Sequence, residues 1–547
     1  MKRAVLVIAA LLVLASCGSA DGPVGEPSPG PQERPDAPNS TPSAAPTPAP
    51  TPTPTPTPER RAWGPNDEQY AEAADVVAGM SIEEQAGQVI VARYTGTTAP
   101  VELVERLHLG GVIVMGDNVS SVDQVRTMNS DLAASDDRGH PLVIGVDQEG
   151  GRVARIGAPA TEFPNLMTLG AARDPDLAAK VARASGTELR ALGFTMVFAP
   201  VADVTTGPDD PTIASRSPGS DPELVAEIVN GALRGYADAG IMAVAKHFPG
   251  HGSVPADSHE ELPVQDASLA ELRGRDFVPF RAAVDGGVPA VMLAHIDVTA
   301  IDPGVPSSLS GPVVDLLRDD VGFEGVVLTD AQEMAAVAAR YGSGEAAVRA
   351  LNAGVDLLLM PADVDAAHAE IVDAVEDGRL DPARLAEAAT QVVALMLFQA
   401  SMGEAPGADA VGSHERVSYD ASLAGLTVVS GPCEGPLVGD GIVIDGGTAL
   451  DRERLAAAAR DAGLEVGSGD VVRLLGALPP APSSGDVVVS LDTPYALGES
   501  SAATAKIALY GRTPAAFRAL VDVLLGHASG GGELPVEVPD TDRPGCP

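Results

Sequence analysis

The feature that most constrains the fold of this chain is a repeated alternation of short apolar segments with longer amphipathic ones. Eight such apolar segments occur between residues 89 and 360. Near-continuous apolar segments of this kind are typical of parallel strands that are buried on both faces and connected by helices. Eight strand–helix units favour an α/β fold of the TIM type, the (β/α)8 barrel, and a doubly wound open sheet is the alternative. The segments are residues 89–94, 111–115, 142–147, 194–203, 241–247, 290–296, 325–330 and 355–360.

Ionisable residues follow several of these segments at the point where each predicted strand ends. An Asp at any single position of this kind is commonly a cap for the following helix. When many strand ends carry such residues, an active site is the better explanation, because the carboxyl ends of barrel strands converge on one face. The residues at these strand ends are Asp147, Asp203, Lys246, His247, His295, Asp297 and Asp330.

The first 17 residues have the pattern of a bacterial export signal. A positively charged start is followed by an apolar stretch over residues 4–14, which is too short to span a bilayer as a mature helix. The stretch leads into the sequence LASC, which ends at Cys17 and resembles a lipobox. We therefore expect lipidation of Cys17 and anchorage at the extracytoplasmic face of the cell membrane. An ordinary signal peptide with a chance cysteine is the alternative.

Composition then divides the rest of the chain. Residues 18–62 are dominated by Pro, Thr, Ser and Ala, and they include a Thr-Pro repeat over 47–58. Such a segment cannot bury a core, and it is expected to form an extended spacer. A barrel-shaped catalytic domain is expected over residues 63–405, and a smaller C-terminal α/β domain over residues 412–547.

The C-terminal region contains no group of clustered ionisable residues and no glycine-rich phosphate loop after a strand. Strands are expected over residues 441–444 and 486–491, and helices over residues 452–462 and 514–525. We therefore expect the catalytic groups to lie in the barrel domain. Substitution of acidic residues in the C-terminal region should leave turnover largely intact.

Charge and cysteine content restrict the classes of function. The chain carries 35 Lys and Arg against 76 Asp and Glu, a net charge of −41. Such a charge repels nucleic acid, so we expect no nucleic-acid partner. Besides Cys17, the chain has two cysteines, Cys433 and Cys546. In an exported protein these two residues either form a disulfide or remain unrelated thiols.

The densest group of ionisable side chains lies in residues 246–259. The sequence KHFPGHGS begins at Lys246, and the triplet DSH follows at residues 257–259. Such a group suits a site that grips hydroxyl groups and moves a proton. An imidazole titrates near neutrality, so His259 can give and take a proton, and Asp257 can orient its ring. A solvated loop histidine is the alternative for His259 alone.

These motifs resemble glycoside hydrolase family 3, in its β-N-acetylglucosaminidase branch. The resemblance covers roughly residues 70–400 and includes three further segments. They are DQEGGRVAR at 147–155, FAPVADV at 198–204 with SRS at 215–217, and GVVLTD at 325–330.

The resemblance implies roles for individual residues. Asp330 is the expected nucleophile of a retaining mechanism, His259 the acid/base, and Asp257 the group that orients His259. Structural ion pairing is the alternative for the arginines among the expected sugar contacts. No Cys or His cluster has the spacing of a metal site, so neither metal nor cofactor is expected. The expected contacts to sugar hydroxyls are Asp147, Arg155, Arg216, Lys246 and His247.

The resemblance also implies an activity. The expected enzyme is a retaining β-N-acetylglucosaminidase that releases N-acetylglucosamine from the non-reducing end of a glycan, with peptidoglycan fragments as the natural substrate. A β-N-acetylglucosaminide phosphorylase is one alternative, because a His donor carries no negative charge to repel phosphate. A β-glucosidase or xylosidase of the same family and a catalytically dead cell-wall-binding lipoprotein are the others.

Overall fold

The structure is a computed structural model that describes residues 64–135, 138–477 and 481–546. These residues belong to one compact unit. The predicted export signal, Cys17 and the Thr-Pro repeat lie outside the described residues, so their expected roles stay predictions.

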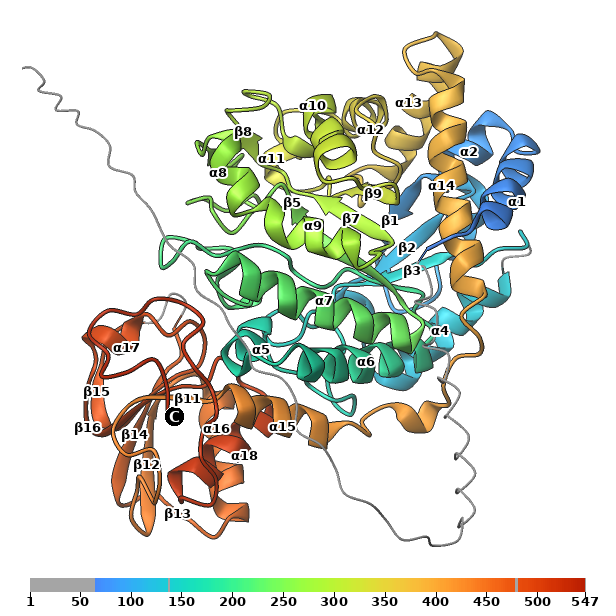
Figure 1. The fold of residues 1–547 in the computed structure, drawn as a ribbon. Helices are drawn as coiled ribbons and strands as arrows, with labels where there is room; N and C mark the ends of the chain where they lie inside the picture. Colours follow the sequence, from blue (N-terminus) through green and yellow to red (C-terminus); the bar gives the residue numbers. More distant parts are fainter. Residues whose placement is uncertain (1–63, 136–137, 478–480, 547) are drawn as a thin grey trace, which may run out of the picture. The chain divides into compact units, whose positions relative to one another are not determined.

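Eight parallel strands form the first sheet, in the same order as in the sequence (Figure 1). β10 pairs with β1 at one side, and a bridge between Leu328 and Leu357 joins β9 to the segment before β10. The sheet is therefore a nearly closed barrel, which confirms the predicted fold and excludes the open sheet. The strands are β1 Ile90–Ala92, β2 Gly111–Val114, β3 Val143–Val146, β4 Met196–Val197, β5 Met242–Phe248, β7 Ala290–Leu293, β9 Val326–Thr329 and β10 Leu358–Leu359.

Helices follow the strands and surround the barrel (Figure 1). α2 begins with a capping box in which the side chains of Ser81 and Glu84 bond each other's backbone N–H. The helices of this region are α1 Asp67–Ala78, α2 Ile82–Gln88, α3 Val101–Leu107, α4 Val122–Ser135, α5 Leu166–Ala172, α6 Pro175–Ala191, α7 Pro222–Ala239, α8 Leu269–Gly274, α9 Phe277–Asp285, α10 Gly311–Asp315, α11 Ala335–Ala338, α12 Ser343–Asn352, α13 Val364–Glu376 and α14 Pro382–Ala400.

Some strands are shorter than the apolar segments predicted. The segment over residues 194–203 contributes only the two residues of β4. Pro200 has no N–H to donate to a ladder, and the ladder with β5 beyond it is reduced to a bridge between Val201 and Lys246. The remaining apolar residues of the segment are buried in loop conformation.

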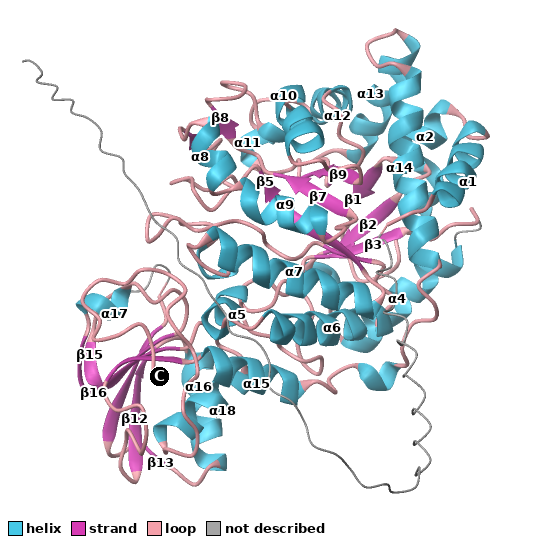
Figure 2. Ribbon diagram, viewed as in Figure 1, coloured by secondary structure: helices cyan, strands magenta, loops and turns pink. Residues whose placement is uncertain are grey.

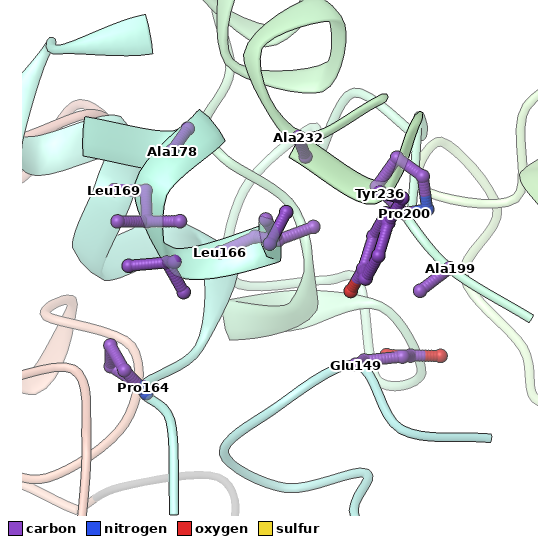
Figure 3. Close-up of a pocket in the computed structure, with 11 residues that line it drawn as sticks. Glu149, Pro164, Leu166, Leu169, Ala178, Ala199, Pro200, Ala232 and Tyr236 are labelled. Carbon is purple, nitrogen blue, oxygen red and sulfur yellow. The ribbon is translucent and has the colours of Figure 1, made fainter. Parts of the chain in front are cut away.

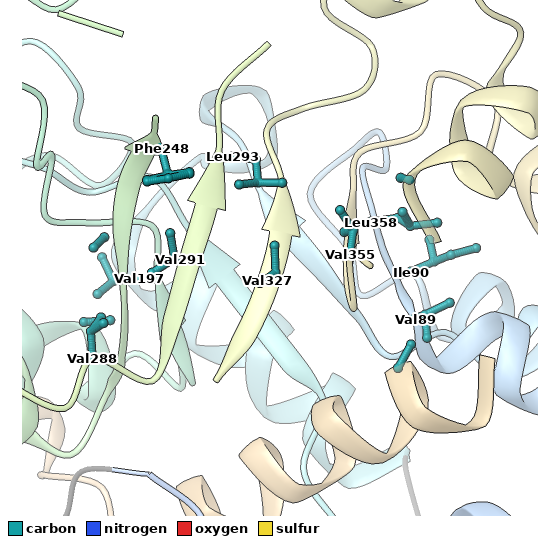
Figure 4. Packing of buried hydrophobic residues seen from close by; sticks show 14 of the residues in the cluster. Val89, Ile90, Val197, Phe248, Val288, Val291, Leu293, Val327, Val355 and Leu358 are labelled. Atoms are coloured by element: carbon teal, nitrogen blue, oxygen red, sulfur yellow. The ribbon is translucent and has the colours of Figure 1, made fainter. Parts of the chain in front are cut away.

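The barrel has one apolar layer inside and another between strands and helices. Val112 and Val114 of β2 pack outward, whereas Ile113 points into the barrel with Met242 and Val244 of β5. A Cβ at residue 145 would lie 2.7 Å from the Phe198 ring, so this ring fills space that a side chain on β3 would take. Figure 4 shows part of the outer layer, including Val291 of β7 and Val327 of β9.

A small sheet lies across the loops that follow β5 and β7. β6 Val264–Gln265 pairs in parallel with β8 Asp297–Val298. The backbone N–H of Asp297 also donates to Pro263, just before β6. This pairing holds the far end of the loop that carries Asp257 and His259.

The C-terminal region has its own six-stranded sheet, in the order β11-β16-β15-β14-β12-β13 (Figure 2). Only β11 is antiparallel to its neighbour, and the other pairs are parallel. The predicted strands correspond to β12 and β15, and the predicted helices to α16 and α18. The elements are α15 Glu415–Gly425, β11 Thr427–Ser430, β12 Gly441–Gly446, α16 Ala449–Asp461, β13 Glu465–Val466, β14 Asp470–Leu475, β15 Ser484–Ser490, α17 Ala496–Glu499, β16 Ser501–Ala508 and α18 Pro514–Leu524.

Cys433 and Cys546 form a disulfide, with their Cα atoms 5.6 Å apart and a sequence separation of 113. This decides between the two alternatives that the sequence left open for these cysteines. Among the residues that the structure describes, no helix is both long and apolar enough to span a bilayer.

Candidate active site

On three strands the inward-facing alternation reaches a charged residue at or just past the carboxyl end. On β5, Met242 and Val244 point into the barrel, and Lys246 is the next residue in this register. On β9 the same rule leads from Leu328 to Asp330, and on β3 it leads from Val143 to Asp147. Apolar residues thus fill the barrel below, and charged side chains follow at the end where barrel active sites lie.

Lys246 is the centre of this charged layer. Its side chain is only 3% exposed, and its Nζ lies 2.8 Å from Asp147 Oδ1 and 2.8 Å from Glu149 Oε1. Burial alone would lower the pKa of Lys246, but the two carboxylates raise it above its ordinary value. Lys246 is therefore a buried cation at neutral pH.

Arg216 and Glu149 form a bidentate ion pair. Arg216 donates through Nε to Glu149 Oε2 at 2.9 Å and through Nη2 to Glu149 Oε1 at 2.8 Å. Burial alone would raise the pKa of Glu149, but the charges of Arg216 and Lys246 hold it well below its usual range. Two cations and one carboxylate are thus locked together next to Asp147.

His247 is oriented by Asp203. The His247 Nδ1 lies 2.7 Å from Asp203 Oδ2, and a carboxylate can only accept, so the proton is assigned to Nδ1. Asp203 also accepts the backbone N–H groups of His247 and His251. The His247 Nε2 lies 3.4 Å from Arg216 Nη2, which joins His247 to the same layer.

Arg155 stands at the edge of this group. Its Nη2 lies 3.8 Å from Asp147 Oδ2, and its side chain is 27% exposed. Gln148 accepts the backbone N–H groups of Arg155 and Ile156, which folds the loop after β3 back on itself. The five residues predicted to contact sugar therefore lie in one connected set.

Asp330 ends β9 beside this layer. Its backbone N–H donates to the Leu293 carbonyl on β7, and its Oδ1 accepts the N–H of Ala331 at 2.8 Å. Burial alone would raise the pKa of Asp330, but His247, His295, the Ala331 N–H and Lys246 together lower it to about 2. The carboxylate is therefore ionised at neutral pH, as a nucleophile requires.

His295 holds the backbone next to Asp330, because it bonds the carbonyl of Ala331. It is fully buried, its Nδ1 lies 2.6 Å from Ser308 Oγ, and its Nε2 donates to the Ala331 carbonyl at 3.0 Å. Burial lowers the pKa of His295, so the ring is neutral. Asp297 does not join the site, because its Oδ1 accepts the N–H of Gly304 within its own loop.

His259 and Asp257 form a separate pair on the loop after β5. His259 Nδ1 lies 2.7 Å from Asp257 Oδ1, and the same oxygen accepts the backbone N–H of His259 at 2.9 Å. The His259 side chain is 63% exposed. Its Nε2 is therefore on the solvent side of an oriented ring, as a proton donor and acceptor requires.

Ser258, between these two residues, attaches the loop to the barrel. Its Oγ lies 2.8 Å from His251 Nε2, and its carbonyl accepts the N–H of Ala336 on α11. Burial lowers the pKa of His251 to about 4, so its ring is neutral and braces the loop.

Two buried carboxylates of the site were not among the predicted contacts. Glu149 lies in the predicted sugar-binding segment, two residues after Asp147, and Asp203 was one of the strand-end residues. Both carboxylates contact side chains that are 44 to 97 residues away in sequence, and local spacing cannot predict contacts over such separations.

A cavity of 10 Å³ lies next to Glu149 and is lined by Pro200 and Tyr236 among others (Figure 3). It is too small for a sugar ring.

Within the described ranges, no group of three His, Cys, Asp or Glu side chains is arranged to hold a metal ion. The buried cations of the site form ion pairs with the carboxylates described above. The arrangement offers what glycosyl transfer to water needs: an ionised carboxylate, a proton carrier on a loop, and charged groups that can bind hydroxyls.

The nearly closed parallel barrel carries this set of groups at its carboxyl end, where barrel active sites lie. The chain belongs to glycoside hydrolase family 3: the model described as "Glycosyl hydrolase family 3 N terminal domain" matches residues 81–395.

Named relatives agree with this assignment. The chain is 34% identical over 369 residues to Beta-hexosaminidase A of Pseudoalteromonas piscicida, which covers 61% of this chain and 62% of that protein. It is 36% identical to Beta-hexosaminidase LpqI of Mycobacterium tuberculosis, over 53% of this chain and 75% of that protein. The chain thus spans less than two thirds of the Pseudoalteromonas protein.

A solved structure is similar over both sheets. The family 3 β-N-acetylglucosaminidase of Paenibacillus sp. str. FPU-7 is 30% identical, with a TM-score of 0.76. The match covers 85% of this chain and all of that one.

Proposed function

We propose that this protein is a retaining β-N-acetylglucosaminidase that releases N-acetylglucosamine from the non-reducing end of a glycan. The observation that carries the proposal is Asp330, held ionised at the carboxyl end of the barrel beside a layer of buried charged groups. The relatives named as β-hexosaminidases support the choice of sugar.

In the first step, Asp330 attacks the anomeric carbon as the bond to the leaving oxygen breaks. The bonding electron pair departs with that oxygen, and protonated His259 donates its proton there. A glycosyl ester on Asp330 results. In the second step, His259 takes a proton from water, the water oxygen bonds to the anomeric carbon, and the ester bond breaks to restore the carboxylate.

The buried layer holds the sugar during both steps. Asp147 accepts from sugar hydroxyls, whereas Lys246, Arg155 and Arg216 donate to them, and charge-assisted bonds of this kind are strong where water is excluded. His247 presents its Nε2 to the same space. The ion pairs described above keep these groups in place before substrate arrives.

Hydrolysis of a panel of nitrophenyl glycosides tests this function. The N-acetylglucosaminide should be cleaved far faster than the glucoside or the xyloside, and Asp330→Asn should be nearly inactive on all of them. Faster cleavage of the glucoside would replace the proposal with a β-glucosidase. The same assay with added phosphate distinguishes a phosphorylase, because the product would then be the sugar 1-phosphate.

For the natural substrate and location, we propose peptidoglycan fragments and the extracytoplasmic face of the cell membrane. The lipobox-like sequence before Cys17 supports the anchor. The full-length protein should fractionate with membranes, and Cys17→Ala should release it or leave it uncleaved. Unchanged membrane attachment of that variant would contradict the anchor. Release of N-acetylglucosamine from peptidoglycan fragments, compared with chitobiose, tests the substrate.

A further inference from the structure

A turn of the C-terminal region meets the loop after β3. The turn, Leu491 to Tyr495, follows β15 and is held by a bond from Ser490 Oγ to the Thr493 carbonyl at 2.6 Å. Asp492 lies in this turn with its side chain only 1% exposed. Neither of its oxygens has a hydrogen-bond partner within the described part of the chain.

The countercharge of Asp492 belongs to the barrel. Arg152 Nε lies 3.6 Å from Asp492 Oδ2, and the Arg152 side chain is 26% exposed. A buried carboxylate is costly unless a charge or hydrogen bonds compensate it. Arg152 is the cation that provides this compensation, so the position of Asp492 constrains the position of Arg152.

A second contact holds the backbone of the same residue. Asn165 Oδ1 accepts the backbone N–H of Arg152 at 3.0 Å, and Asn165 Nδ2 donates to the Tyr510 carbonyl of the C-terminal region at 2.6 Å. Gly151 has φ +54°, and a Cβ there would lie 1.8 Å from Asn165 Oδ1. The loop therefore approaches Asn165 more closely than any side chain at residue 151 would allow.

Arg152 lies in the middle of the loop that carries the sugar-site groups. The backbone of Glu149 donates to the Val153 carbonyl at 2.9 Å, so a displacement at Arg152 reaches Glu149 within one tight turn. Glu149 in turn holds Arg216 and Lys246.

From these contacts we infer that Asp492 of the C-terminal domain is a positioning residue for the sugar site, acting through Arg152 on the loop from Glu149 to Arg155. The inference rests on the proposed function for its kinetic readout. It revises the expectation that acidic residues of the C-terminal region do not affect turnover. The catalytic groups remain in the barrel, and the second domain sets the geometry of their neighbours.

Asp492→Asn in the full-length protein tests the inference, because it keeps the shape and removes the charge. A loosened sugar-binding loop weakens contacts made in both ground state and transition state, so KM should rise more than kcat falls. We expect kcat/KM to drop on the order of tenfold. Arg152→Gln should behave alike, and the double variant should lose no more than the worse single variant.

Asp486→Asn is the matched control. Asp486 lies on the same strand, β15, and its Oδ2 accepts the N–H of Val471 within the C-terminal sheet at 2.8 Å. This variant should lose stability without changing KM. Equal kinetics for Asp492→Asn and Asp486→Asn, or losses at Asp492 and Arg152 that simply add, would overturn the inference.

Hydrogen exchange separates this inference from the proposed function. Amides of residues 149–155 should exchange faster in Asp492→Asn than in Asp486→Asn, with no substrate present. If the wild-type protein cleaves no N-acetylglucosaminide, the proposed function fails while this readout still decides the inference. If the wild type is active and the loop exchanges equally in both variants, the inference alone fails.

Discussion

The groups around Asp330 stabilise its charged form. Its partial burial alone would favour the neutral acid, yet the nearby histidines, the Ala331 N–H and Lys246 lower its pKa to about 2. His259 has the opposite environment, exposed on a loop with only Asp257 to orient it. The two residues therefore suit different tasks, nucleophilic attack for the first and proton transfer for the second.

The low pKa of Asp330 predicts a pH-dependent contribution to stability. Folding lowers this pKa from 3.8 to about 2, so the stabilisation is complete above the unfolded pKa and is lost as the pH falls through the folded one. Between pH 6 and pH 2, wild type should lose about 2 kcal/mol more free energy of unfolding than Asp330→Asn. Urea unfolding at stepped pH measures this, and parallel curves for both proteins would contradict it.

The role of His259 predicts a dependence on the leaving group. His259→Ala removes proton transfer, which contributes roughly 10² to 10⁴ in rate. A nitrophenolate leaves readily without a proton, whereas a sugar alkoxide needs one. The variant should therefore lose far more activity on a disaccharide than on an aryl glycoside.

Azide provides the control for His259→Ala. Azide needs no base to attack the glycosyl ester, so it should accelerate turnover of the variant on an aryl glycoside. Equal losses on both substrates, with no effect of azide, would remove His259 from the mechanism.

At the scale of elements, the loop from β5 to β6 positions His259, the proposed proton carrier. Its far end is held by β6 pairing with β8, and its middle by Ser258, which contacts both His251 and α11. The loop is attached at Ser258, the residue between Asp257 and His259. Such an attachment determines how often His259 is in place.

Ser258→Ala should therefore lower kcat more on a disaccharide than on an aryl glycoside, but less than His259→Ala does. The expected loss is several-fold, since one hydrogen bond is worth about 0.5–1.5 kcal/mol. Kinetics on the two substrates measure it. Ser268→Ala is the control, because Ser268 caps α8 beyond the loop and its loss should lower stability without any leaving-group preference. A Ser258→Ala loss that is equal on both substrates would contradict the role.

At the scale of the whole molecule, the C-terminal domain is stabilised by an internal disulfide and by contacts with the barrel. The disulfide links Cys433 to Cys546 within the C-terminal domain. Asn165, Arg152 and Arg454 make contacts between the barrel and the C-terminal domain. Through these contacts, the stability of the C-terminal domain affects the geometry of the barrel site.

Removal of the disulfide should lower the stability of the C-terminal domain. Closing a loop of 113 residues is worth about 4–5 kcal/mol in chain entropy. A Cys433→Ser/Cys546→Ser variant should unfold at a lower temperature than wild type. A reductant should lower the melting temperature of wild type and leave that of the variant unchanged. Identical melting of the two proteins without reductant would show that the disulfide does not form.

The sequence by itself determined the barrel and the chemistry of its candidate site. Apolar periodicity is a local signal, and eight repeats of it leave few alternatives to parallel strands connected by helices. The proton carrier and its partner are two residues apart, so their pairing also follows from local sequence. The strand-end positions of Asp330 and Lys246 predict that both residues lie on one face of the barrel.

Only the tertiary structure decided which charges meet. Glu149 contacts Lys246 across 97 residues, and Asp492 contacts Arg152 across 340, at distances set by the packing of separate elements. Whether a carboxylate is buried, paired or exposed depends on that packing, and so do the pKa of Asp330 and the influence of the C-terminal domain on the site. These properties arise from contacts that no spacing within the sequence encodes.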